Sequence, residues 1–174
     1  MSEPTSQPTA GRIVVGIDGS TESNHALRWA ASEARLREAT LSVVHVWGIP
    51  YVALGTDAQR LHDPTVIDAA RREAQELVSR MLFELGDEAT GLQIEEAVVE
   101  GAPGPSLLEA AGDADLLVLG SYGHGGPGGA RPGSTGEECA RHAVCPVVIV
   151  PPPRATEGRQ RPQAPWQSRG RTRP

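Results

Sequence analysis

The stretch that decides the fold is Leu116-Leu117-Val118-Leu119-Gly120-Ser121-Tyr122-Gly123, followed after nine residues by Gly133-Ser134-Thr135. It has the pattern of a buried strand that ends in glycines and leads to a helix start bearing hydroxyl groups. Glycines let backbone N–H groups approach a ligand closely, and a helix N-terminus favours negative charge. The stretch therefore predicts an α/β protein that holds phosphate at the end of this strand. Because the chain contains no lysine, the pattern favours holding a nucleotide over P-loop phosphoryl transfer.

Apolar segments of strand length lie on both sides of this stretch. Together with residues 116–119 they predict five strands, at 12–18, 41–47, 93–99, 116–119 and 146–151. Helical spacing of apolar residues predicts helices between them, one capped by Ser20 or Thr21 with a stripe from Ala26 to Leu36, and others at 65–85, 106–111 and 134–143. The segments 48–63 and 86–91 read as a loop and a break, and Pro105 is expected at the first position of the third helix.

The alternation of strands and helices predicts one domain with a parallel sheet and right-handed crossovers. The domain is expected to span 11–151, between a polar tail at 1–10 and a disordered tail rich in Pro and Arg at 152–174. The third and fifth strands are expected at the sheet edges. Ligands of such sheets bind beyond the carboxyl ends of the strands, where Asp18 and Gly120 both lie. If the first and fourth strands are neighbours, the two residues face one cleft.

Composition narrows the function classes. The core must be aliphatic, because aromatic residues make up only 3% of the chain. The net charge is −6, and residues 154–174 carry six Arg and one Glu, or +5, which leaves −11 for the rest. An acidic body argues against specific nucleic-acid binding, so the arginine tail is read as solvated rather than as a contact for nucleic acid or an acidic partner. No apolar run approaches the roughly 20 residues that span a bilayer, the first ten residues do not resemble a secretory signal, and two cysteines make no disulfide framework. These features predict a cytoplasmic protein without a membrane partner.

Five motifs, in this order, resemble the universal stress protein family. They are Val15-Gly16-Ile17-Asp18-Gly19-Ser20, Val44-His45-Val46, Gly101-Ala102-Pro103, Gly120-x2-Gly123-x9-Gly133-Ser134 and Cys145-Pro146-Val147-Val148. The resemblance covers residues 12–151, and the spacing of the fourth motif is that of the ATP-binding branch. It implies a Rossmann-like α/β domain similar to adenine nucleotide α-hydrolases, with a five-stranded parallel sheet of order 3-2-1-4-5 and helices on both faces. It also implies a homodimer formed through the last strand, Val147 to Val150.

The resemblance further implies ATP, with Mg²⁺ carried by the nucleotide, as the ligand. Gly16 and Ile17 would line the adenine, and the main chain of Val46 would hold its edge. Asp18 would contact the ribose or the metal–phosphate region. The remaining implied residues pass under the ribose or donate to the phosphates: Leu119, Gly120, Ser121, Gly123, Gly133, Ser134 and Thr135. No catalytic residue and no protein-held metal are expected, so ATP hydrolysis should be slow or absent.

Two features depart from the family pattern. Tyr122 stands at a position that is often basic in relatives, and residues 124–132 are rich in glycine where relatives carry bulky apolar residues. A glycine-rich loop has more conformational entropy to lose on ordering, so the expected affinity is weaker than the motif suggests. His124 and Arg131 are the nearby cationic candidates for the phosphates.

Simpler explanations exist for most of these residues. Asp18 could be a turn residue before the first helix, and Gly120 and Gly123 could serve a tight turn. Ser134 and Thr135 are expected to cap the last helix with or without a ligand. Val46 is expected in the core, and His45 is expected to be a strand residue bonded to its neighbours. Cys139, His142 and Cys145 have a spacing that could suit a metal, but small buried cysteines are the commoner case.

Three functions follow, in order of preference. The first is a universal stress protein that binds ATP and acts as a nucleotide-responsive regulator, with a possible regulatory protein partner. The second is a dimeric protein-interaction module with the same fold and no nucleotide. The third is an enzyme of the related α-hydrolase group, such as an adenylating ligase, which the segment Asp18-Gly19-Ser20-Thr21 does not match.

Overall fold

The computed structural model describes residues 11–48, 63–122 and 133–152. Strands and helices alternate along these segments. The elements are β1 (Arg12–Ile17), α1 (Thr21–Arg37), β2 (Thr40–Trp47), α2 (Pro64–Leu85), the 3₁₀ turn η2 (Gly86–Ala89), β3 (Ile94–Glu100), α3 (Pro103–Ala110), β4 (Leu116–Gly120), α4 (Ser134–His142) and β5 (Val147–Val150).

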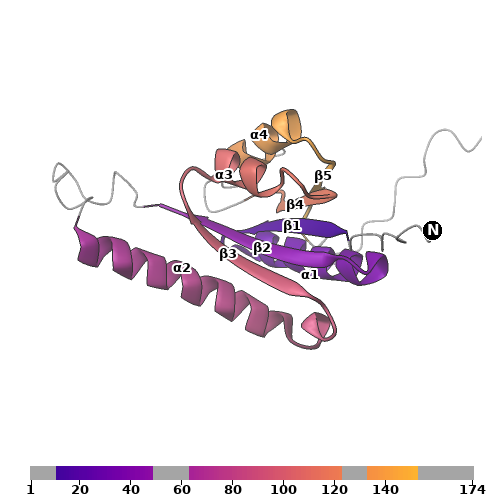
Figure 1. Ribbon diagram of the computed structural model, residues 1–174, viewed down its shortest axis with the longest axis horizontal. Coiled ribbons are helices and arrows are strands. Elements are labelled where there is room, and N and C mark those ends of the chain that lie inside the picture. The colour runs from indigo at the N-terminus through magenta and orange to yellow at the C-terminus, as the bar shows by residue number, and fades with distance from the viewer. Residues whose placement is uncertain (1–10, 49–62, 123–132, 153–174) are drawn as a thin grey trace, which may run out of the picture.

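The five strands form one parallel sheet of order β3-β2-β1-β4-β5. The predicted fold class is therefore confirmed, as are the edge positions of β3 and β5. Helices α1 and α2 cover one face of the sheet, and α3 and α4 cover the other (Figure 1). The chain thus reverses its direction of travel across the sheet between β1 and β4. That reversal places the carboxyl ends of β1 and β4 at the switch point where ligands of such folds bind.

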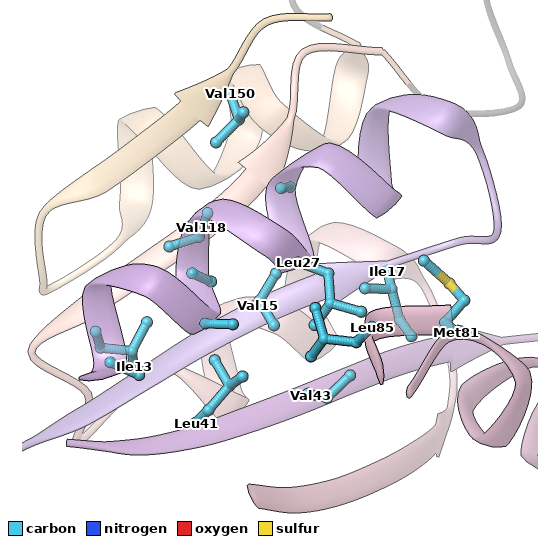
Figure 2. Close-up of a cluster of buried hydrophobic side chains, with 14 of the residues drawn as sticks. Ile13, Val15, Ile17, Leu27, Leu41, Val43, Met81, Leu85, Val118 and Val150 are labelled. Atoms are coloured by element: carbon cyan, nitrogen blue, oxygen red, sulfur yellow. The ribbon is translucent and has the colours of Figure 1, made fainter. Parts of the chain in front are cut away.

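Alternating residues of each strand supply two separate cores. Ile13, Val15 and Ile17 of β1 point toward α1 and α2, where they pack with side chains of both helices (Figure 2). Val14 points to the other face and packs with Leu107 of α3 and Cys139 of α4. The buried hydrophobic residues are mainly aliphatic, as the composition predicts. Burial of a central parallel strand on both faces explains why β1 is continuously apolar.

The boundaries of some helices differ from those expected. Helix α3 begins at Pro103, which takes the first helical position in place of Pro105. A proline suits that position because its missing N–H would have no partner inside the helix. Leu36 is 77% exposed and does not belong to the buried stripe of α1. The break after α2 contains the 3₁₀ turn η2.

The lengths and compositions of the helices show whether one of them could cross a membrane. Among the described residues, no helix combines the length and apolar character that crossing a bilayer requires.

Candidate functional site

The carboxyl ends of β1 and β4 lie side by side. Val15 of β1 pairs with Val118 of β4, and Asp18 and Ser121 each directly follow the last residue of these two strands. Helix α1 follows β1 and connects it to β2, whereas α4 follows β4 and connects it to β5 on the other side. The structure therefore brings together the two segments that the sequence places on one cleft.

Asp18 organises the turn between β1 and α1. Its Oδ1 accepts hydrogen bonds from the backbone N–H of Ser20 (3.0 Å) and from the Ser20 hydroxyl (2.6 Å). The intervening Gly19 has a φ of 84°, which glycine adopts at little cost. Ser20 then caps α1, because its Oγ accepts from the N–H of Ser23 at 3.1 Å. The turn role of Asp18 is confirmed, and its position also fits the expected contact with a ligand.

Gly120 lies where β4 meets the first turn of α1. A Cβ at this position would lie 2.9 Å from the carbonyl carbon of Glu22 and 3.0 Å from the nitrogen of Ser23. Both are backbone atoms, which cannot move aside as a flexible side chain can. Gly120 is thus required for the close approach of two main chains that border the site.

The two halves of the glycine motif are joined by backbone hydrogen bonds. Gly133 donates its N–H to the carbonyl of Ser121 at 3.1 Å, and Ser121 donates its own N–H to the carbonyl of Val150 at 2.9 Å. Ser121, the start of α4 and the end of β5 therefore form one cluster. Gly123 lies outside the described residues, as do His124 and Arg131.

The hydroxyl of Ser121 is buried without a partner. Its Oγ is shielded from solvent and has no hydrogen-bond partner within the described part of the chain. A buried polar atom of this kind costs stability unless something satisfies it. The hydroxyl lies beside the glycine backbone at the switch point, so a ligand oxygen or nitrogen is a suitable partner. This observation, at the point where Gly120 lets β4 approach the start of α1, fits a bound nucleotide.

The N-terminus of α4 begins at a glycine. Gly133 is the N-cap, and in the described part of the chain it gives this helix no side-chain cap. The expectation that Ser134 and Thr135 cap this helix is wrong, because both lie within its first turn. A side chain caps only from the position before the helix, which Gly133 occupies. The uncapped N–H groups of the first turn can therefore donate to an anion.

Acidic residues near the start of α4 are turned to other partners. Glu137 pairs with Arg141 one helical turn further on, at 2.6 Å. The carboxylate of Glu138 lies against Gly104 in the first turn of α3, in space that a Cβ on Gly104 would fill. Glu137 is thus paired with a cation and Glu138 lies toward α3, which limits their repulsion of a phosphate at the N-terminus of α4.

The expected adenine side is formed mainly by backbone. The side chains of Ile17 and Leu119 are buried on opposite faces of the sheet, and a Cβ on Gly16 would lie 2.7 Å from Leu119. Only main-chain groups of these three residues can meet a ligand. Val46 is partly buried and packs against the core beneath α3, so its side chain has the core role that the sequence predicts.

The sequence analysis did not predict that the His45 side chain bonds the end of β1. His45 is a bonded strand residue, as expected, and its Nδ1 lies 2.8 Å from the carbonyl oxygen of Ile17. Its place directly before Val46 is the one sequence signal that could have connected it to the site.

The cysteines belong to the core rather than to the site. Cys139 is fully buried. Its burial, with smaller effects of Glu138 and Cys145, raises its pKa from 9.0 to about 11. Burial also raises the pKa of Cys145. The described residues hold no group of three His, Cys, Asp or Glu side chains arranged to bind a metal ion.

Comparison with known proteins identifies relatives of the chain. The model of the universal stress protein family matches residues 9–151. A universal stress protein of Mycobacterium tuberculosis is 32% identical over 154 residues, which cover 86% of this chain and 50% of that protein. The chain spans about half the length of the curated relatives that it matches.

Solved structures of the same kind include two with bound nucleotides. A universal stress protein in complex with cAMP is 30% identical, with a TM-score of 0.51 over 80% of this chain and 95% of that one. The universal stress protein from Archaeoglobus fulgidus in complex with dAMP is 27% identical, with a TM-score of 0.53 over 80% of this chain and 97% of that one.

Proposed function

Because the chain belongs to the universal stress protein family, we propose that it binds ATP as the Mg²⁺ complex and acts as a nucleotide-responsive stress regulator in the cytoplasm. The observation that carries the proposal is the buried, unpartnered Oγ of Ser121 beside the glycine backbone of β4. The cAMP and dAMP complexes of two structural relatives support an adenine nucleotide as the ligand class.

Main-chain groups would hold the phosphates. The first N–H groups of α4, from Ser134 onward, and the backbone around Gly120 and Ser121 face the same edge of the sheet. A helix N-terminus contributes about 0.3–1 kcal/mol for an exposed anion, so several donors must act together. The bound polyphosphate would also give the Ser121 hydroxyl the partner that the described residues do not supply.

The other end of the nucleotide would lie over β1 and β2. Val46 would hold the adenine edge through its main chain, with Gly16 and Ile17 beneath it. Asp18 would hold the ribose or the Mg²⁺–phosphate region, where its carboxylate neutralises the cation. The Mg²⁺ would arrive bound to the nucleotide, and Asp18 would orient the complex.

Hydrolysis is expected to be slow or absent. Fast phosphoryl transfer needs a group that orients the attacking water and a cation that stabilises the transition state. In the described part of the site, the groups proposed to meet the phosphates are backbone N–H groups and hydroxyls, and the Asp18 carboxylate is assigned to the ribose or the metal. These groups would hold a triphosphate, and none is assigned the task of activating water.

Calorimetric titration with MgATP tests the proposal. The expected result is binding in the micromolar range by the folded chain. Ser121→Ala is expected to weaken binding while leaving the free energy of unfolding of the ligand-free protein equal or higher, because it removes a buried group with no partner. Ser79→Ala, an exposed change on α2, is the control and should alter neither quantity. No heat from folded wild-type protein would overturn the proposal in favour of a protein-interaction module.

A further inference from the structure

We propose that His45 is a positioning residue of the nucleotide site, which fixes the peptide group between Ile17 and Asp18 and so orients Asp18 toward the ligand. The inference rests on the proposed function, which assigns Asp18 and Val46 to the ribose and the adenine. His45 itself touches no ligand in this account.

The first step is the hydrogen bond between β2 and the end of β1. Ile17 is the last residue of β1 and pairs with His45. The imidazole Nδ1 lies 2.8 Å from the Ile17 carbonyl oxygen. A carbonyl can only accept, so Nδ1 carries the proton and donates it. The side chain thus holds β1 to β2 at the point where β1 leaves the sheet.

The second step is that the same peptide group is held from its other side. The N–H of Asp18 donates to the Oγ of Ser23 at 3.3 Å, and that hydroxyl donates to the carbonyl of Ser20 at 3.0 Å. Ser23 is buried in the first turn of α1. Both polar atoms of the Ile17–Asp18 peptide therefore have fixed partners, one from β2 and one from α1.

The third step connects this peptide to the ligand. Asp18 follows the fixed peptide directly, and Val46 follows His45 directly. This hydrogen bond thus adds to the backbone pairing of β1 with β2 directly beside the residues proposed to hold the ribose and the adenine edge. Loss of the bond between His45 and Ile17 should weaken the binding of ATP and of AMP to the same extent, because both nucleotides contain adenosine.

Two substitutions separate this role from simple packing. His45→Asn keeps a donor, since the side-chain amide nitrogen of Asn lies close to the place of Nδ1. His45→Leu keeps the bulk and removes the donor. His142→Leu, at the exposed end of α4, is the control for loss of a histidine.

Nuclear magnetic resonance of the ligand-free chain tests the positioning without any nucleotide. The ¹⁵N shifts of His45 should report the tautomer protonated at Nδ1. The Asp18 amide resonance should move in His45→Leu and stay close to its wild-type position in His45→Asn and His142→Leu. A tautomer protonated at Nε2, or an Asp18 amide that is unchanged in His45→Leu, would overturn the proposal.

Titration of the same variants tests the consequence for binding. The net value of one hydrogen bond predicts a loss of affinity of roughly two- to tenfold in His45→Leu for both MgATP and AMP. His45→Asn should bind within about twofold of wild type. Wild-type affinity in His45→Leu would contradict the positioning role even if the proposed function holds. If the wild type binds neither nucleotide, the proposed function fails. A shift of the Asp18 amide resonance in His45→Leu would then limit His45 to a structural role.

Discussion

Gly120 and Ser121 are adjacent residues with different surroundings. At Gly120, backbone atoms of α1 occupy the space where any side chain would begin. At Ser121, the hydroxyl is enclosed but has no partner in the described part of the chain. One residue permits close approach and the other leaves a polar contact to be made. Both features agree with the proposed contact of this strand end with a polar ligand.

Gly120→Ala is expected to destabilise the fold. Its Cβ would lie 2.9 Å from backbone of Glu22, and relieving such overlap typically costs about 1–3 kcal/mol. Chemical denaturation should show a reduced free energy of unfolding. Gly48→Ala is the control, because its Cβ would lie 3.5 Å from its nearest neighbour, which is ordinary contact. Equal stability of the two variants would contradict the close approach.

Cys139 gives the stability a dependence on pH in the alkaline range. Burial, aided by Glu138 and Cys145, raises its pKa from 9.0 to about 11, so the folded protein keeps a proton that the unfolded chain loses. The free energy of unfolding should therefore fall as the pH rises from about 9 to about 11. Urea denaturation across this range should give a shallower fall for Cys139→Ala. The pKa of Cys145 is also raised, so part of the pH dependence of the free energy of unfolding should remain in that variant. An unchanged slope would assign the effect to other groups.

At the scale of elements, the two helices that begin at the site have different N-termini. Helix α1 is capped by Ser20, whose Oγ bonds the N–H of Ser23. Helix α4 starts from Gly133 with no side-chain cap. A side chain thus satisfies one donor in the first turn of α1, the N–H of Ser23, whereas the N-cap residue of α4 has no side chain that could do the same. This difference is consistent with the proposal that α4 holds the phosphate.

Ser20→Ala tests the capping of α1. Loss of the cap is expected to lower the free energy of unfolding by about 1 kcal/mol. It also releases Asp18 Oδ1 from the Ser20 hydroxyl. Thr21→Ala is the matched control, since Thr21 is exposed and lies at the first helical position. Thermal unfolding should rank Ser20→Ala below Thr21→Ala, and the reverse order would be inconsistent with the cap.

At the scale of the whole molecule, the two sheet edges differ in charge. The edge strand β3 carries the exposed glutamates Glu95, Glu96 and Glu100, which discourage pairing with another strand. The opposite edge strand, β5, is uncharged (Val147–Val150). Self-association through β5 is therefore favoured over association through β3.

A homodimer through β5 is accordingly the expected assembly. Light scattering should give a mass near twice the 18.3 kDa of one chain. Val147→Lys should shift the mass toward one chain, because an edge lysine opposes strand pairing and its stem can still cover apolar surface. Glu96→Arg on the other edge is the control and should leave the mass unchanged. A monomer at high wild-type concentration would contradict the prediction.

Local patterns in the sequence were enough for much of this protein. Buried parallel strands are continuously apolar, so the five strands and their alternation with helices were predictable, and the family resemblance implied their order. The placement of Asp18 and Gly120 at one edge followed, because parallel strands end on the same side of a sheet. Ser20 was correctly among the two candidates for the cap of α1, since capping depends on residues close in sequence.

Only the tertiary structure decided contacts between segments that are distant in sequence. The start of α3 at Pro103, the uncapped start of α4 and the contact between Gly120 and α1 depend on how helices meet the sheet. The same is true of the enclosed Ser121 hydroxyl and of the bond from His45 to Ile17. The sequence thus determined, through local periodicity and turn chemistry, which residues lie at the carboxyl ends of the strands. Packing across the sheet determined which of their polar atoms already have partners, because that depends on atoms contributed by other elements.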